Sequence, residues 1–441
     1  MRRARTPGTR AVILPRACGS VQARAGPAPP ARGCRSGAGA RRLAAARMPR
    51  PLASAVLWPL SLLVGVGAFA LTNLVEPALP ATLNFGTDYA AMAADPFGYV
   101  GSFPHRLLTP LCARGLDELA RAFGGSLPYW QFAHGCTIAF LAILFGAAHR
   151  LGATPAQALL LTLGIGFTGA VQLYKGHVGY PEPVTFALLL ASLLAARRSA
   201  WFWSLQLLNL LHHEQILFFW PWLCWWRRRH GARWRDDLVG GSVTLAIYVG
   251  WRMHVGTHAK AQMLTLSHYL GLDYFPVGTL GLAALNLLAV FMWFGAMPLL
   301  LAWHVRRERF RDAGAPLLLF LLCQHAMFGV AHDVYRFTCF LFLPLLLAGL
   351  RLMQERRGPI VWTAFAVASA ALVVWQRPVF VEVGVRVLTD TGPDGVPFVR
   401  PHIVADIVPK VIPAMPWTFA AYGAAALVTI AAALARANRP T

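Results

Sequence analysis

Three adjacent polar residues interrupt a long apolar stretch of this sequence. His212, His213 and Glu214 lie between the runs AWFWSLQLLNLL and ILFFWPWLCWW. A single polar residue among apolar helices often only bonds a neighbouring helix, but an adjacent triplet with a carboxylate favours a binding or catalytic site. The run HHEQI lacks the second histidine of the HExxH pattern, which argues against a zinc protease. No resident metal is predicted, although a divalent cation bound by this triplet together with Asp88 stays open.

Three further groups of polar residues lie at the ends of apolar runs. They are Asp88, Asp95, His105 and Arg106 within residues 76–127, Lys175, His177 and Glu182 in YKGHVGYPEP, and His332, Asp333 and Arg336 in HDVYR. An arginine suits a phosphate because its planar fork donates paired charge-assisted hydrogen bonds. In a functional interpretation Arg336 faces a phosphate and Asp333 orients it. In a structural interpretation the two residues, three apart, only pair on one helical face.

Each of the other charged residues also has a plain structural interpretation. Arg106 could extend to the membrane surface with its stem on apolar groups, and Asp88 could cap a helix. Lys175 could be an interfacial anchor. Glu182 could be a favourable carboxylate at a helix N-terminus, although a charge at the start of an apolar helix needs a partner or water.

The composition excludes a soluble domain. Of 441 residues 57% are hydrophobic and only 13% are charged. The apolar sequence divides into segments of roughly 17 to 25 residues, each long enough to cross a bilayer as a helix. They lack the alternation of a transmembrane barrel strand. We predict an all-α polytopic membrane protein with about 10–12 transmembrane or half-membrane helices in one domain at 51–436. Apolar spans are expected near 51–75, 128–147, 154–173, 180–196, 236–255, 277–303, 315–332, 337–353, 359–376 and 414–434.

The net charge of +22 depends strongly on the N-terminal segment. Residues 1–50 hold twelve arginines and no acidic residue, and they are rich in Ala, Gly and Pro. Such a segment cannot bury enough surface to fold, so we predict disorder. Translation from Met48 and an arginine-rich targeting peptide are two further interpretations. The basic excess elsewhere lies beside helix ends, so we expect no nucleic-acid partner.

Short basic loops predict which side of the membrane each loop occupies. They are at Arg150, Arg197 and Arg198, in the runs from Arg227, His304 and Gln354, and in both chain ends. By the positive-inside rule these loops are cytoplasmic. Residues 200–226 have basic residues at both ends, so one crossing would invert every later loop. We therefore predict a re-entrant pair of short helices that meet at the HHE triplet and line a cavity, with a single ordinary span as the alternative.

This topology puts the candidate groups on the outer side of the membrane. The outer segments are 76–127, 174–180, the HHE turn, 256–276, 332–336 and 377–413. Residues 105–123 have helical periodicity, with leucines on one face and the charges from Arg114 to Arg121 on much of the other. We expect them to form an amphipathic helix along the membrane surface.

The order of these features resembles that in bacterial membrane glycosyltransferases of the GT-C superfamily. An acidic first outer loop, the run PHRLLTPL, a later glutamate-containing turn and a D-x-x-R step before FLPLLL follow one another over residues 51–353. The resemblance implies a polyprenyl-phosphate-linked sugar donor, an inverting transfer and a catalytic acid in the first outer loop. The chain lacks a DxD motif and a large soluble C-terminal domain, which leaves metal dependence and substrate open.

The resemblance also assigns roles to the residues. Asp88 would be the general base, with Asp95 as its competitor, and Arg106 and Arg336 would hold the donor phosphate. Glu182 and Glu214 would bind sugar hydroxyls or an ion. The remaining predicted substrate-binding residues are His105, Lys175, His177, His212, His213, His332 and Asp333.

The resemblance places the chain in the bacterial cytoplasmic membrane with its active side extracytoplasmic. Its partners would be membrane lipid, the lipid-linked donor and an acceptor that is an envelope glycan, lipid or protein. The main rival is a transporter or flippase of a lipid-linked or anionic substrate, which could also use broken helices and buried charge. A third hypothesis is acyl transfer with His213 as base.

Overall fold

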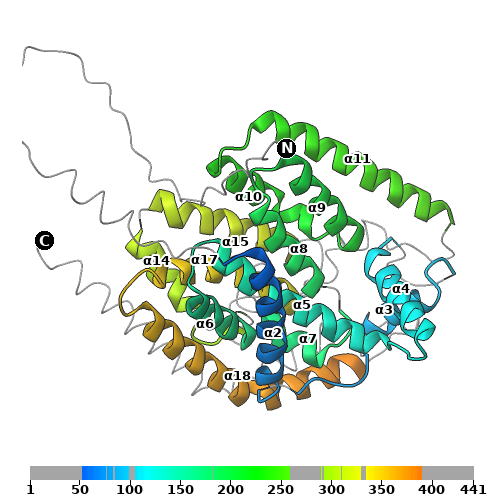
Figure 1. The fold of residues 1–441 in the computed structure, drawn as a ribbon, viewed down its shortest axis with the longest axis horizontal. Helices are drawn as coiled ribbons and strands as arrows, with labels where there is room; N and C mark the ends of the chain where they lie inside the picture. Colours follow the sequence, from blue (N-terminus) through cyan, green and yellow to red (C-terminus); the bar gives the residue numbers. More distant parts are fainter. Residues whose placement is uncertain are drawn as a thin grey trace, which may run out of the picture.

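The regular elements of the chain are helices. The computed structural model describes residues 52–75, 77–82, 85–98, 105–180, 182–258, 290, 293–308, 310–328 and 334–389. Within these ranges there are helices and no strands, so the predicted all-helical class is confirmed (Figure 1). The N-terminal segment 1–50, most of 256–297 and all of 390–441 lie outside the described residues, together with the predictions made for them.

Two helices are long and apolar enough to cross a membrane by themselves. They are α2 (Ser54–Thr72) and α5 (Tyr129–Arg150), which match the spans predicted at 51–75 and 128–147. The two helices pack closely because Gly65 of α2 has no side chain. A Cβ atom there would lie 2.7 Å from the carbonyl oxygen of Ile138. The described residues thus contain two such spans, or three if a bent helix pair is counted as one.

That bent pair covers the span predicted at 154–173. The structure has α6 (Pro155–Gly166) and α7 (Gly169–Gly176), with a bend of 48° between them. Thr168 ends one helix and begins the next, since its hydroxyl donates to the carbonyl of Ile165 and accepts from the N–H of Ala170. Hydropathy does not register such a break, because a threonine cap changes the mean hydropathy very little.

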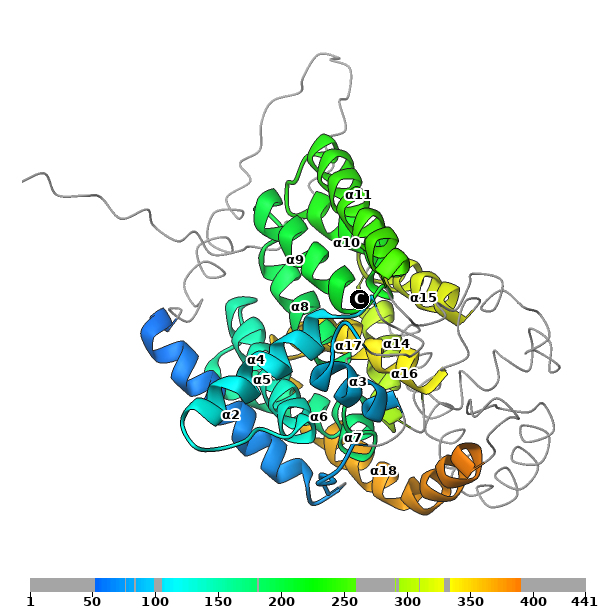
Figure 2. The same cartoon turned by 90° about the vertical axis from the view of Figure 1, so that its right-hand side faces the viewer.

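The stretch with basic residues at both ends forms two short helices that reverse direction. They are α9 (Ser199–His212) and α10 (Ile216–Arg229), and α11 (Trp234–His258) follows. Arg227, near the end of α10, donates to the hydroxyl of Ser199 at 2.8 Å, so the start of α9 and the end of α10 lie together. Figure 2 shows α8 (Glu182–Leu194), α9, α10 and α11 beside one another. Whether this hairpin enters a membrane from one side remains a prediction.

The C-terminal part of the described chain supplies the remaining helices of the bundle. It comprises α14 (Pro298–Arg307), η2 (Phe310–Gly314), α15 (Ala315–Phe328), α16 (Val334–Thr338), η3 (Cys339–Leu341), α17 (Phe342–Leu352) and α18 (Gly358–Thr389). Aromatic side chains join this part to the earlier helices, since the ring of Phe186 on α8 contacts those of Phe140, Phe340 and Phe342. These four residues are fully buried and form part of the main apolar core.

Helix α18 extends into the outer segment predicted at 377–413. The helix continues to Thr389, well past the apolar run 359–376. A hydropathy profile marks where apolar side chains stop, whereas the hydrogen-bonded backbone can continue into a polar stretch. The predicted outer segment 377–413 is therefore helical over its first part.

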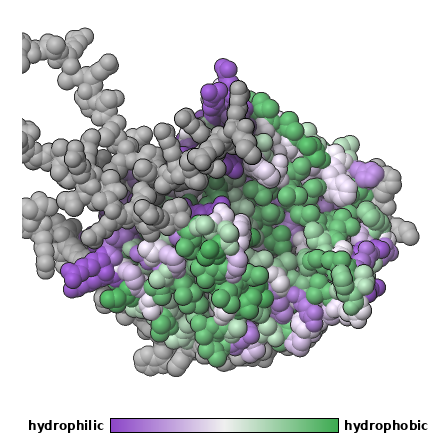
Figure 3. Space-filling view, in the orientation of Figure 1, coloured by the Kyte–Doolittle hydropathy of each residue, from purple (hydrophilic) through white to green (hydrophobic). Residues whose placement is uncertain are grey.

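Apolar side chains cover much of the outer surface. Figure 3 shows apolar residues over α2 and along α11, where the large exposed residues include Leu63, Leu238, Val239 and Met253. A soluble protein rarely exposes so large an apolar surface. These helices are therefore candidates for contact with lipid.

Candidate functional site

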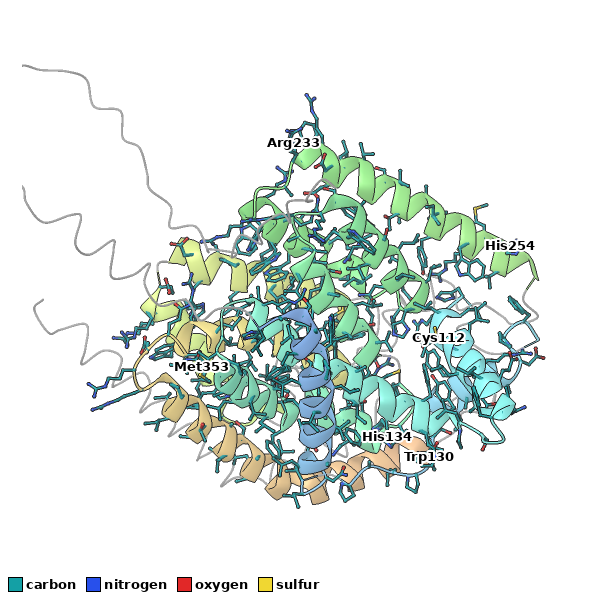
Figure 4. All side chains as sticks on the ribbon, viewed as in Figure 1. Cys112, Trp130, His134, Arg233, His254 and Met353 are labelled. Carbon is teal, nitrogen blue, oxygen red and sulfur yellow. The ribbon has the colours of Figure 1, made fainter. Side chains whose placement is uncertain are left out.

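Six of the predicted site residues gather around the turn between α9 and α10. We call the following set the polar cluster: His105, Arg106, Glu182, His213, Glu214 and Arg336. Figure 4 shows Cys112 of the first loop toward the end of α11 that carries His254, away from the end at Arg233. Residues from four separate parts of the chain meet at the turn.

The first ion pair of the cluster joins the first loop to the turn. Nε of Arg106 donates to Oε2 of Glu214 at 2.9 Å, and its Nη2 donates to Oε1, so the contact is bidentate. The third nitrogen, Nη1, donates to the hydroxyl of Tyr89 at 3.0 Å. Arg106 is 5% exposed, which excludes the interpretation that it only extends to the surface. Burial raises the pKa of the Tyr89 phenol, which therefore stays neutral and able to donate.

His105 contacts the same carboxylate oxygen of Glu214 as Nε of Arg106 does. Its Nε2 lies 3.3 Å from Oε2 of Glu214, and its backbone carbonyl accepts a hydrogen bond from Nε1 of Trp251 at 3.1 Å. Burial lowers the pKa of the His105 imidazole, against the opposing effect of Glu214. The ring is therefore neutral at neutral pH and donates a hydrogen bond from Nε2 to the carboxylate.

The second ion pair connects α8 to α16. Nε of Arg336 donates to Oε1 of Glu182 at 2.6 Å, and Nη2 donates to the same oxygen. The guanidinium carbon lies 4.6 Å from the centroid of the Tyr180 ring, a cation–π contact. The glutamate is buried completely. Its helix-start position was predicted, but its partner, 154 residues away, was not.

His213 lies between the two ion pairs. Its Nδ1 is 3.8 Å from Oε2 of Glu214, and its Nε2 is 3.9 Å from Oε1 of Glu182 and 3.4 Å from Nη2 of Arg336. The backbone N–H of Gln215 donates to Nδ1 at 3.3 Å. The imidazole thus links the first pair to the second.

The neighbouring His212 has a different role. Its Nδ1 is hydrogen-bonded to the hydroxyl of Thr109 at the start of α4 (Leu108–Ala122). This contact holds α4 against α9. The exposed leucines of α4, Leu111, Leu116 and Leu119, lie on one helical face, while Arg114–Glu118 and Asp117–Arg121 form ion pairs on the other. The amphipathic helix predicted in the first loop is therefore present.

The two ion pairs differ in their access to solvent. The side chain of Glu214 is 23% exposed, whereas that of Glu182 is not exposed at all. We call Arg106–Glu214 the open pair and Arg336–Glu182 the closed pair. An incoming ligand can reach the open pair first.

Asp88 lies on the helix that supplies Tyr89 to the cluster. It is in the first turn of α3 (Phe85–Ala94) and is half-buried. Two glycines let α3 pack closely against the segment that follows α7. A Cβ atom on Gly179 would lie only 2.7 Å from the Cα of Gly86. Gly179 also has φ of +102°, which favours glycine. Asp95 is exposed one residue beyond α3 and caps a turn by accepting the N–H of Gly98 at 3.0 Å, outside the cluster.

The other predicted binding residues have structural contacts. Lys175 is fully buried and its Nζ donates to the carbonyl of Phe69 at 3.1 Å and to the side chain of Asn73, at the end of α2. His177 follows α7 and packs its ring against Tyr180. His332 and Asp333 lie outside the described residues, so the predicted pairing of Asp333 with Arg336 does too.

Sequence reasoning missed residues of α11 that border the cluster. Tyr248, Trp251 and Arg252 follow at helical spacing near its C-terminal end. Their signal was available, because tyrosine, tryptophan and arginine at positions i, i+3 and i+4 share a helix face within an otherwise apolar segment.

Within the described ranges no group of three or more His, Cys, Asp or Glu side chains has the arrangement of a metal site. Comparison with protein families, with curated proteins and with solved structures finds no match to this chain. The fold and the cluster therefore define a helical protein with candidate membrane spans and a charged site among its helices, and its function must be argued from the site.

Proposed function

We propose that this protein is a membrane glycosyltransferase that transfers a sugar from a polyprenyl-phosphate-linked donor to an acceptor. One observation carries the proposal: two arginines, two glutamates and two histidines from distant segments converge at the turn between α9 and α10, next to the helix that bears Asp88. The proposal agrees with the order of motifs that resembles the GT-C superfamily.

The reaction needs two kinds of groups, and the chain offers both near this turn. Attack of an acceptor hydroxyl on the anomeric carbon needs a general base within hydrogen-bond reach. Asp88, half-buried and one residue from Tyr89, has that role in the proposal. The departing lipid phosphate needs cationic donors that stabilise its charge.

The ion pairs fix the arginines before any ligand binds. Both carboxylates of the cluster are engaged by a guanidinium, so a phosphate that binds Arg106 must share it with Glu214 or replace it. The open pair permits this, because Glu214 reaches solvent. The closed pair has the positioning role, holding Arg336 and His213 in place from a buried position.

The amphipathic helix α4 supports a donor that arrives from lipid. It exposes a face of leucines next to the cluster and is joined to α9 through Thr109 and His212. A polyprenyl tail can lie along such a face while its phosphate reaches the turn. In the proposal this end of the bundle is on the extracytoplasmic side of a bacterial cytoplasmic membrane, and the acceptor is an envelope glycan, lipid or protein.

The experiment is a transfer assay with matched carboxamide variants. Purified protein is incubated with radiolabelled polyprenyl-phosphate sugars and bacterial envelope membranes, and labelled product is extracted. We expect transfer by the natural chain, a loss of at least 100-fold in Asp88→Asn, and little change in the control Asp95→Asn, whose carboxylate only caps an exposed turn. Undiminished turnover in Asp88→Asn would refute the assignment of the base.

A transporter or flippase of a lipid-linked or anionic substrate is the second candidate. The break of 48° between α6 and α7 favours it, since transporters bind substrates at interrupted helices. Reconstituted vesicles distinguish the two candidates. Movement of a fluorescent polyprenyl phosphate between leaflets without sugar transfer would favour the transporter.

A further inference from the structure

Helix α11 brings a third guanidinium to the polar cluster. Tyr248, Trp251 and Arg252 lie within one and a half turns of this 25-residue helix. Tyr248 is 3% exposed and continues the buried stripe of Thr244, whereas Arg252 is half-exposed. The helix therefore presents the tyrosine to the interior and the arginine at its border.

Contacts tie this part of α11 to the open pair. Nε1 of Trp251 donates to the carbonyl of His105, the residue before Arg106. Tyr248 lies within electrostatic range of Glu214 and Arg106, and Arg252 lies within range of His105. Nη1 of Arg252 also donates a long hydrogen bond of 3.4 Å to the hydroxyl of Tyr248. Arg252 is thus a neighbour of the open pair.

Arg252 differs from the other two arginines in its charge balance. Arg106 and Arg336 each hold a glutamate, but no described carboxylate forms an ion pair with Arg252. Among the described contacts, its N–H donors make only the long hydrogen bond to Tyr248. A half-exposed guanidinium beside a buried hydroxyl is a good binding group for an anion.

The surface around Arg252 indicates where that anion comes from. Val249 and Met253, on the same turns of α11, are 45% and 68% exposed. An anion at Arg252 thus has apolar surface on its flank, which suits a phosphate with a hydrocarbon tail better than a free ion. Arg252 is also more exposed than Arg106, so a headgroup that approaches from the surface can meet it first.

We propose that Arg252, with the hydroxyl of Tyr248, is the entry site for a lipid-borne phosphate, which it delivers to the open pair. This inference rests on the proposed function and adds a substrate-binding residue to it. It also explains how Arg106 can stay paired with Glu214 in the empty site, because the first recognition of the phosphate does not require that pair to open.

The test measures lipid binding and needs no turnover. Purified full-length protein in a maltoside detergent is titrated with tritiated undecaprenyl phosphate and, in a parallel arm, with undecaprenol, which lacks the phosphate. We expect the natural chain to bind the phosphate at least about ten-fold more tightly, since charge-assisted bonds to a phosphate are strong. Arg252→Gln should remove most of that preference, and Arg252→Lys should keep part of it.

The matched control is Arg235→Gln, which removes the same charge from the exposed start of the same helix. It should leave the preference unchanged. A preference retained in Arg252→Gln overturns the inference, as does the absence of any preference in the natural chain. Equal displacement of the lipid by inorganic phosphate at similar concentration overturns the lipid assignment.

Asp88→Asn separates this inference from the proposed function. The aspartate acts on the acceptor, so its carboxamide variant should bind undecaprenyl phosphate as the natural chain does. Sugar transfer that survives in Arg252→Gln with unchanged Michaelis constant would sink the entry site and leave the transferase proposal standing. Thermal unfolding of both variants should match that of the natural chain.

Discussion

The hairpin of α9 and α10 carries buried charge at both of its ends, and the two ends differ. At the end where the helices start and finish, Arg227 is fully buried and donates to Asp237 at 2.6 Å, to the carbonyl of Ala196 at 3.0 Å and to Ser199. Its guanidinium also lies 4.3 Å from the ring of Phe202. At the turn, Glu214 and His213 meet residues from the first loop, α8 and α16, and part of the glutamate reaches solvent.

The comparison shows that buried charge alone does not indicate a site. At the Arg227 end, the partners of this arginine lie within about 30 residues of it in the chain. All three guanidinium nitrogens of Arg227 donate to acceptors of the protein itself. The turn end joins residues more than 100 positions apart and leaves a carboxylate accessible. Distance in the sequence and access to solvent are the two features that separate the candidate site from the Arg227 end.

The largest effect on stability should come from breaking the ion pair at the Arg227 end of the hairpin. Arg227→Met leaves the carboxylate of Asp237 buried without its main partner and should lower the free energy of unfolding by about 3–5 kcal/mol. Thermal unfolding in detergent measures this. The double variant Arg227→Met with Asp237→Leu should recover much of the loss, and failure of that recovery would show that the ion pair is not the cause.

The next largest losses of stability should come from the two glutamates of the polar cluster, and they should differ in size. Glu182→Gln removes the fully buried carboxylate that pairs with Arg336 and should cost about 3 kcal/mol or more of stability. Glu214→Gln, at the partly exposed pair, should cost about 1–3 kcal/mol. Equal losses in the two variants would remove the distinction between the open and the closed pair.

Acid should lower the stability of the folded chain through His105. Burial holds the pKa of this imidazole below its usual 6.5 in the folded chain, so the unfolded chain takes up the proton first as the pH falls. The contribution of His105 to stability is therefore complete above about pH 6.5 and is lost as the pH falls toward the lower, folded value. Melting temperatures from pH 7.5 to 5 should drop more steeply in the natural chain than in His105→Gln.

The smallest effect should be at the surface of α4. Arg114 and Glu118 form an i,i+4 pair with both side chains well exposed. Such pairs are screened by water and salt, so Glu118→Gln should leave the melting temperature and sugar transfer unchanged. A clear loss in either measurement would mean that the charged face of α4 contacts something beyond solvent.

Local patterns predicted the helices well. Apolar runs gave α2 and α5, and the spacing of leucines and charges gave α4. The basic residues on both sides of 200–226 predicted two helices there. Both basic ends are expected on the cytoplasmic side, and a single helix would put one of them outside. Side-chain caps such as Thr168 were not recognised, since they change no average property of the chain.

The site was predicted residue by residue, but its contacts were not. Glu182 and Glu214 were singled out because a carboxylate in an apolar run needs a partner, yet the partners Arg336 and Arg106 lie 154 and 108 residues away. No local pattern in a single sequence carries such distances. Lys175 was grouped with the site because it is charged, whereas the structure uses it to bind the end of α2.

The distance in sequence between charged partners sets the order in which the ion pairs can form during synthesis. Asp237 is synthesised ten residues after Arg227, so this pair can form while the hairpin is still near the translation machinery. Arg106 must wait for Glu214, and Glu182 must wait for Arg336, over ten times that length. During biogenesis the turn therefore stays incomplete until α16 arrives, and a truncated chain that ends before α16 would have a folded hairpin but no working site.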